Sequence, residues 1–211
     1  SYVLYAYHVG YSGKLAFPEL LDAVYSPVTS LGVAFVLLFD NDVVRDGEGG
    51  LFPELYASGP NRACLNARVY MKWMFYAVLH GLLAWEVPFL TLLGDLPDAA
   101  MEQGFKFWQV SFTAFTIVII VVHVKILLVV DKPIRPLGFM AVVAEILAYF
   151  GVAFVLGSPL CRTLDSNMTG IPVSVLTSVS HILLMIVVPM ASLFFDIVAL
   201  SGARLVEGVR R

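Results

Sequence analysis

Apolar runs long enough to cross a lipid bilayer constrain this chain more than any other feature. A hydrocarbon core of about 30 Å requires roughly 20 residues of α-helix, and only helices and closed barrels satisfy every backbone group in lipid. Five runs reach or approach that length, at residues 22–39, 71–93, 107–130, 136–156 and 173–200. Residues 1–12 have the composition of the end of a preceding span, so we expect a longer parent polypeptide.

The composition agrees with a membrane protein. Hydrophobic residues make up 59% of the 211 residues, and charged residues make up only 14%. The mean hydropathy is +0.86. The net charge of −3 offers no basic face for a nucleic acid, so we expect no nucleic-acid partner. We predict an all-α fold, a polytopic transmembrane helical bundle that forms a single membrane domain with five full spans and the tail of a preceding one.

The basic residues predict which loops face the cytosol. With alternating spans, most Lys and Arg residues fall on or near one side, in the linker 40–70, around 131–135 and at the C-terminus. The excess of positive charge makes this the cytosolic side of an integral, multi-pass membrane protein. Asn167 begins an N-glycosylation sequon and falls on the outer side, which agrees with this orientation. Cys64 and Cys161 fall on opposite sides, so we expect no disulfide between them.

Ionisable side chains inside the spans are candidates for function, because each costs roughly 2.5–3.5 kcal/mol at the centre of a span. Glu86 and Glu145 lie well inside their spans, where a structural, hydrogen-bonded carboxyl and a proton or cation ligand are both open interpretations. We expect Lys125 to extend to the membrane interface. For Asp196 we expect solvation or pairing with Arg204.

The remaining polar and small residues of the spans favour structural roles. His80 and His181 stand alone on apolar helices, as hydrogen-bonded core histidines do, and Gly104, Gly138 and Gly151 favour close helix packing. The sequence has no GxSxG, no glycine-rich phosphate loop and no HExxH. We therefore expect no catalytic residue, no metal site and no cofactor in this chain.

The first span and the polar linker after it carry the most recognisable motifs. Residues 9–14 read Val-Gly-Tyr-Ser-Gly-Lys, the span contains Thr29-Ser30-Leu31-Gly32, and it ends in Phe39-Asp40-Asn41-Asp42-Val43. The linker continues with Pro53, Leu55, Tyr56 and Gly59, then Leu65-Asn66, and residues 122–125 read Val-His-Val-Lys. In order and spacing these features resemble the C-terminal membrane region of the type IV P-type ATPases, the phospholipid flippases. That family has Thr-Ser-Leu-Pro, Phe-Asp-Gln-Asp-Val, Pro-x-Leu-Tyr-x-x-Gly and often Val-Asn-Leu-Lys.

The resemblance implies ATP-driven movement of a phospholipid from the outer to the cytosolic leaflet. It also implies an autophosphorylated Asp, ATP and Mg2+ in the remainder of the parent protein, and usually an accessory glycoprotein subunit. Neither the Asp-Lys-Thr-Gly nor the Asp-Gly-Glu-Thr motif of the family occurs in this chain. We therefore expect no catalysis by this chain alone.

The same resemblance places the path of the lipid headgroup along the first span, at Tyr25, Thr29 and Ser30. Tyr25 stands where the family has a polar Asn, Gly32 replaces its Pro, and Val9 replaces the Asn of its outer turn. These departures predict an altered headgroup site. Two alternatives stay open: a flippase-like scaffold or sensor of a larger signalling protein, such as a guanylate cyclase fusion, and a stand-alone subunit of a membrane complex.

Overall fold

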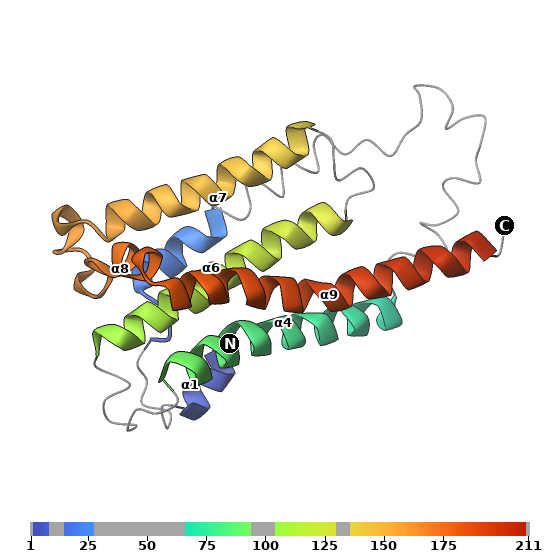
Figure 1. The fold of residues 1–211 in the computed structure, drawn as a ribbon, viewed down its shortest axis with the longest axis horizontal. Helices are drawn as coiled ribbons and strands as arrows, with labels where there is room; N and C mark the ends of the chain where they lie inside the picture. The colour runs from blue at the N-terminus through green and yellow to red at the C-terminus, as the bar shows by residue number, and fades with distance from the viewer. Residues whose placement is uncertain (1, 9–14, 28–65, 94–103, 130–135, 210–211) are drawn as a thin grey trace.

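The computed structural model describes residues 2–8, 15–27, 66–93, 104–129 and 136–209, which form a bundle of helices running up and down (Figure 1). Four helices are long and apolar enough to cross a membrane: α4 (Ala67–Leu93), α6 (Phe105–Val129), α7 (Pro136–Leu156) and α9 (Val179–Val209). The prediction of a polytopic helical bundle is confirmed. Most of the expected span 22–39, and the linker motifs of residues 40–65, lie outside the described residues.

The shorter elements lie around these four helices. They are α1 (Tyr2–His8), a helical segment at residues 19–27, α8 (Ile171–Thr177) and two single-turn 3-10 helices, η2 (Pro159–Cys161) and η3 (Ser166–Met168). We call the end of the bundle that carries η2, η3 and α8 the cap end. The opposite end, where α9 ends, is the C-terminal end (Figure 1).

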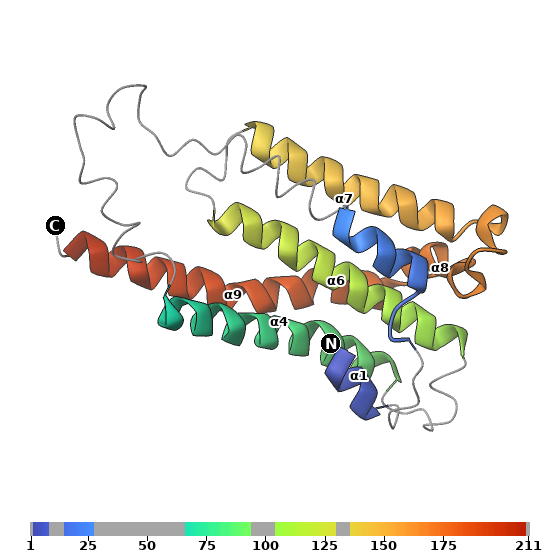
Figure 2. The same ribbon diagram turned by 180° about the vertical axis from the view of Figure 1, so that it is seen from behind.

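Helix α6 lies at the centre of the bundle. In both ribbon views it runs between α7 on one side and α4 and α9 on the other (Figure 2). Its apolar stretch is 61% buried inside the bundle, compared with 22% for α7. Because lipid tails are as apolar as leucine, van der Waals packing and interhelical hydrogen bonds hold such helices together. Among the described residues, α6 also makes side-chain hydrogen bonds to several other segments, through Gln109, Ser111, Thr116, His123 and Lys125.

Helix α9 faces the bundle with one stripe of side chains. The buried positions recur every three or four residues, at His181, Met185, Val188, Ser192 and Asp196. This spacing is one face of an α-helix. The opposite face exposes apolar residues, among them Leu183, Ile186, Met190, Phe194 and Ile197. Such an apolar face is suited to lipid or to packing against a further span.

Two of the long helices contain a proline, which removes one backbone hydrogen bond from each. In α4 the Thr91 hydroxyl, three residues after Pro88, donates to the carbonyl of Val87 at 2.6 Å. In α9 the Ser192 hydroxyl, three residues after Pro189, contacts the carbonyls of Val188 and Pro189, both at 3.0 Å. Hydroxyl groups thus supply extra hydrogen bonds at each proline, as is common in spanning helices.

The apolar run 173–200 is divided between two helices. α8 ends at Thr177, Ser178 adopts an extended conformation (φ −93°, ψ 120°), and α9 begins at Val179. Serine favours the position before a helix because its hydroxyl bonds locally, here with His181 Nδ1 at 2.9 Å. The sequence did not reveal this break, since Thr177 and Ser178 are weak signals within an apolar run.

The close approach of α8 to the end of α7, at the cap end, depends on Gly157. A Cβ added to Gly157 would lie 2.6 Å from Pro172 Cδ, so any larger residue would push α8 away from the end of α7. Gly157 O also accepts from the backbone N–H of Gly170, at 2.9 Å. The prediction of close packing at Gly138 and Gly151 is wrong for the described residues, because nothing lies within 4 Å of a Cβ built there. Both lie on α7, the least buried of the four long helices.

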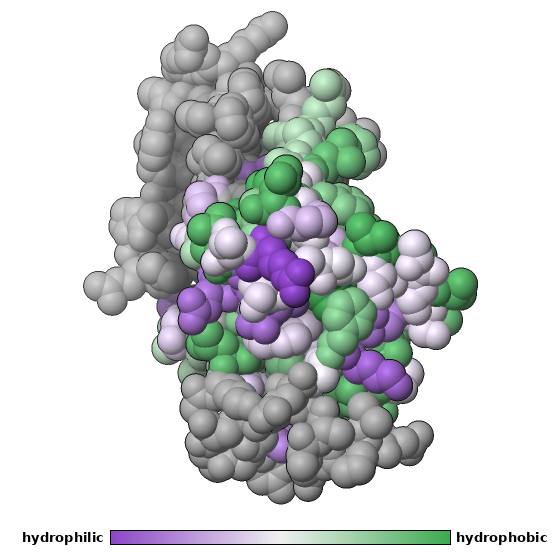
Figure 3. Space-filling view, turned by 90° about the vertical axis from the view of Figure 1, so that its left-hand side faces the viewer, coloured by the Kyte–Doolittle hydropathy of each residue, from purple (hydrophilic) through white to green (hydrophobic). Residues whose placement is uncertain are grey.

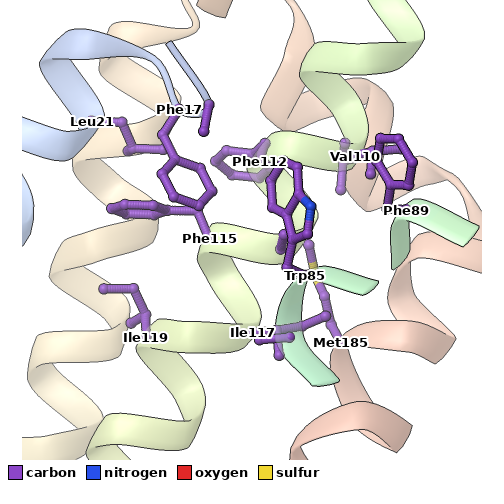
Figure 4. Packing of buried hydrophobic residues seen from close by; sticks show 14 of the residues in the cluster. Phe17, Leu21, Trp85, Phe89, Val110, Phe112, Phe115, Ile117, Ile119 and Met185 are labelled. Carbon is purple, nitrogen blue, oxygen red and sulfur yellow. The ribbon is translucent and has the colours of Figure 1, made fainter. Parts of the chain in front are cut away.

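An aromatic cluster fixes residues 15–27 against α4 and α6 (Figure 4). The Phe17 ring meets Trp85 of α4 edge-on at 5.7 Å and Phe115 of α6 at 5.1 Å. Tyr5 of α1 adds a further edge contact to Trp85, at 5.6 Å. Such pairs contribute about 0.5–1.5 kcal/mol each beyond their buried area. The Ser111 hydroxyl donates to the carbonyl of Ala16 and anchors the same segment to α6.

Candidate lipid path and intramembrane polar residues

Tyr25 is the one residue of the expected headgroup path that the structure describes. It lies on the helical segment 19–27, half-buried, with its ring edge-on to Phe115 at 5.8 Å. Thr29 and Ser30 fall outside the described residues, so their predicted role stays a prediction. Because Phe17 and Ala16 hold the start of this segment, the position of Tyr25 beside α6 follows from packing that is well buried.

Glu86 joins α4 to α1 near the cap end. Both of its carboxylate oxygens lie 3.0 Å from His8 Nε2, and the two side chains are each 23% exposed. The imidazole also stacks on Phe89, at 4.4 Å between ring centroids. The sequence indicated a polar carboxyl at this depth, and the structure supplies its histidine.

Glu145 joins α7 to α6 in a more buried setting. Its Oε2 lies 2.9 Å from Nε2 of His123, a side chain with no exposed surface. His123 Nδ1 lies 2.7 Å from the carbonyl of Ile119. A carbonyl only accepts, so Nδ1 carries a proton. The pair is then either imidazolium with carboxylate or imidazole with carboxylic acid, and in both forms it is hydrogen-bonded and neutral overall.

A third cluster joins three helices and corrects two expectations. Lys125 of α6 lies 3.1 Å from Asp196 of α9, and His80 of α4 lies 3.2 Å from the same oxygen, Oδ2. Lys125 therefore turns inward instead of extending to the membrane interface. Asp196 is buried and paired with Lys125, whereas we expected solvation or pairing with Arg204. The sequence feature that indicates a buried Asp196 is its position on the buried stripe of α9.

Each of the three carboxylates in these clusters lies next to a histidine side chain. His8, His80 and His123 each lie within 3.2 Å of a carboxylate oxygen on another helix, and His181 bonds Ser178. His80 and His181 are buried and hydrogen-bonded through Nδ1, whereas the Nε2 atom of each ring makes no hydrogen bond among the described residues. The expectation of hydrogen-bonded core histidines is thus confirmed for one ring nitrogen of each. No group of three metal-ligating side chains occurs in the part of the chain that the structure describes.

The surface of the cap end is mixed in character. Figure 3 looks onto this end and shows hydrophilic residues among pale and apolar ones. Asn167 lies there, exposed, on η3, and its backbone N–H donates to Asp165 Oδ1 at 3.0 Å. The sequon is therefore on a surface turn, as its use as a glycosylation acceptor requires.

The fold and these clusters define a class: a multi-pass membrane protein whose spans are joined by buried acid–base pairs. A family model described as "Phospholipid-translocating P-type ATPase C-terminal" matches residues 1–206. The chain belongs to this family, and the resemblance drawn from the motifs is confirmed. Comparison with curated proteins gave no match.

Proposed function

We propose that this chain is the membrane portion of an ATP-driven pump that moves a phospholipid from the outer to the cytosolic leaflet. The family match over residues 1–206 carries the proposal. The distribution of Lys and Arg supports the orientation, with the cap end outside and the C-terminal end, together with residues 40–70, in the cytosol.

The proposed headgroup path follows the first span. The Tyr25 hydroxyl, Thr29 and Ser30 offer hydrogen bonds to a polar headgroup, in place of the amide that the family has at Tyr25. Phe17, at the start of this segment, packs against Phe115 and Trp85. These contacts support the proposal, since a helix that lines a lipid path has to keep its position while the lipid passes. α4, α6, α7 and α9 would then act as the support of that helix.

The chemistry of the pump belongs to the parent protein. We propose ATP as its substrate and Mg2+ as its cofactor, a phosphorylated Asp in its cytosolic part, and an accessory glycoprotein subunit as a partner. Co-purification of the tagged parent with one stoichiometric glycoprotein tests the last point. A parent that is active and pure without any such subunit would refute it.

Phosphorylation of the parent protein tests the proposal as a whole. Purified parent incubated with radiolabelled ATP and Mg2+ should form an acid-stable phosphoenzyme that disappears when the right phospholipid is added. In the same assay Tyr25→Phe should weaken the response to lipid, and its matched control is Tyr70→Phe, which also removes only a hydroxyl but at an exposed position on α4. A parent that forms no phosphoenzyme with any lipid would contradict transport.

A scaffold or sensor without transport is the second candidate. Tyr25 in place of the family's Asn favours it, because the headgroup path then lacks one amide. This candidate predicts that the parent binds phospholipid without forming phosphoenzyme, so the same experiment separates the two.

A further inference from the structure

The ammonium group of Lys125 is enclosed on several sides by residues of two other helices. Asp196 of α9 lies at 3.1 Å through Oδ2 and 3.4 Å through Oδ1, and His80 Nδ1 of α4 lies at 3.4 Å. The rings of Trp73 and Tyr76, also on α4, have their centroids 5.0 and 5.1 Å from the same nitrogen. We call Trp73, Tyr76, His80 and Asp196 the ammonium cage.

The chemistry of the ammonium cage matches a primary ammonium. An ammonium only donates, so His80 Nδ1 must present its lone pair to Lys125 and carry its proton on Nε2, the side nearer Asp196. The cage thus offers one anionic acceptor, one neutral acceptor and two aromatic faces, which attract cations through their ring quadrupoles. A bare metal cation instead requires several oxygen ligands.

Lys125 thus has several partners at once: an ion pair with Asp196 at 3.1 Å, a longer contact with His80 at 3.4 Å, and two aromatic rings. The side chains of Lys125, His80 and Asp196 are only 17%, 10% and 8% exposed. Lys125 lies one turn from the end of α6, so a side chain of its length would reach the interface, yet it points inward.

We propose that the ammonium cage is a binding site for a primary ammonium and that Lys125 is its built-in occupant. Asp196 alone would be an uncompensated charge inside the bundle, which is costly in lipid. The tethered ammonium compensates it and holds α6 against α4 and α9. A protein without the Lys125 side chain should therefore bind a small alkylammonium ion in the vacated cage.

Chemical rescue tests this inference on the full-length parent protein in detergent. Lys125→Ala should lower the unfolding temperature by about 5 °C or more, since the buried carboxylate loses its partner. Ethylammonium chloride should restore at least half of this loss with saturable, millimolar dependence, whereas NaCl and KCl at equal ionic strength should not. The control Lys106→Ala, at an exposed position near the start of α6, should show neither the loss nor the rescue.

Two outcomes of this rescue would overturn the inference. One is an equal response to sodium, potassium and ethylammonium, which would show a plain screening effect. The other is a failure of ethylammonium to stabilise the variant at all. The double variant Lys125→Ala with Asp196→Asn lacks the anion and should not respond to ethylammonium, so a response there would place the binding elsewhere.

A measurement on the unaltered protein covers the case in which Lys125→Ala fails to fold. An amine-acylating reagent, followed by peptide mass spectrometry, should modify Lys125 at least tenfold more slowly than the exposed Lys72. Trp73→Leu removes one wall of the cage at a half-exposed position and should speed modification of Lys125 severalfold. Equal rates for the two lysines in the unaltered protein would refute an enclosed ammonium.

Discussion

Glu86 and Glu145 pair with histidines at similar distances, yet they lie in two different parts of the bundle. Glu86 and His8 join α1 to α4, and both side chains are 23% exposed. Glu145 and His123 join α6 to α7, with His123 fully buried and Glu145 11% exposed. One pair lies at the edge of the described bundle, where α1 meets α4, and the other lies at its centre, on α6 (Figure 2).

The difference in burial changes what each pair does. A fully buried pair is costly to break because the remaining partner loses its compensation and cannot be reached by water. A pair with partial access to water can separate and be solvated at lower cost. We infer that the pair of α6 and α7 fixes the centre of the bundle, while the pair of α1 and α4 tolerates movement at its edge.

The largest effect is expected at the buried pair. His123→Ala leaves Glu145 without its imidazole and should destabilise the protein by about 3–5 kcal/mol, measured as a loss of thermal stability of the purified parent. His123→Asn keeps a hydrogen-bonding group, the one that the family often has here, and should cost clearly less. A similar loss for both variants would mean that packing, and not the polar contact, stabilises this region.

A smaller loss is expected at the partly exposed pair, Glu86 and His8. Glu86→Ala removes the partner of His8 but leaves it within reach of water, so we expect a cost of about 1 kcal/mol in the same assay. If this variant is destabilised as much as His123→Ala, the distinction between the two parts of the bundle is wrong.

At the path itself, we expect an effect on turnover and not on folding. Tyr25→Phe removes only the hydroxyl, and the loss of one hydrogen bond of about 0.5–1.5 kcal/mol corresponds to a roughly two- to tenfold loss of lipid-stimulated ATP hydrolysis. The thermal stability should stay as in the unaltered protein, because the ring contact with Phe115 remains. Unchanged turnover would remove Tyr25 from the path.

The smallest effect on the fold is expected at the cap end. Asn167→Gln changes an exposed turn and should alter stability by no more than about 0.5 kcal/mol. In the parent expressed in a eukaryotic cell, it should abolish a glycosidase-sensitive mass shift. If the unaltered protein shows no such shift, the cap end is not the glycosylated outer side that we propose.

The sequence predicted α4, α6 and α7 to within a few residues, because in lipid the length of an apolar run nearly dictates a spanning helix. The run 173–200 was expected as one helix and is two, and most of the expected span 22–39 lies outside the described residues. The sequence also identified Glu86 and Glu145 as notable, since charge at that depth is costly. Their partners were not predictable, because His8 and His123 lie 78 and 22 residues away and pairing depends on how each helix is rotated.

Asp196 shows what a closer inspection of register could have added. It shares a face with His181, Met185, Val188 and Ser192, and such spacing predicts a buried carboxyl. The break at Ser178 had no comparable signal, because Thr177 and Ser178 are weak signals within an apolar run.

Lipid transport by the reconstituted parent protein tests the central claim most directly. Proteoliposomes that carry labelled phospholipids, with ATP and Mg2+ on the side of residues 40–70, should move a phospholipid toward that side at a rate that depends on ATP. A parent that hydrolyses no ATP and moves none of a panel of phospholipids, while it stays folded and binds lipid, would contradict a pump and favour a scaffold.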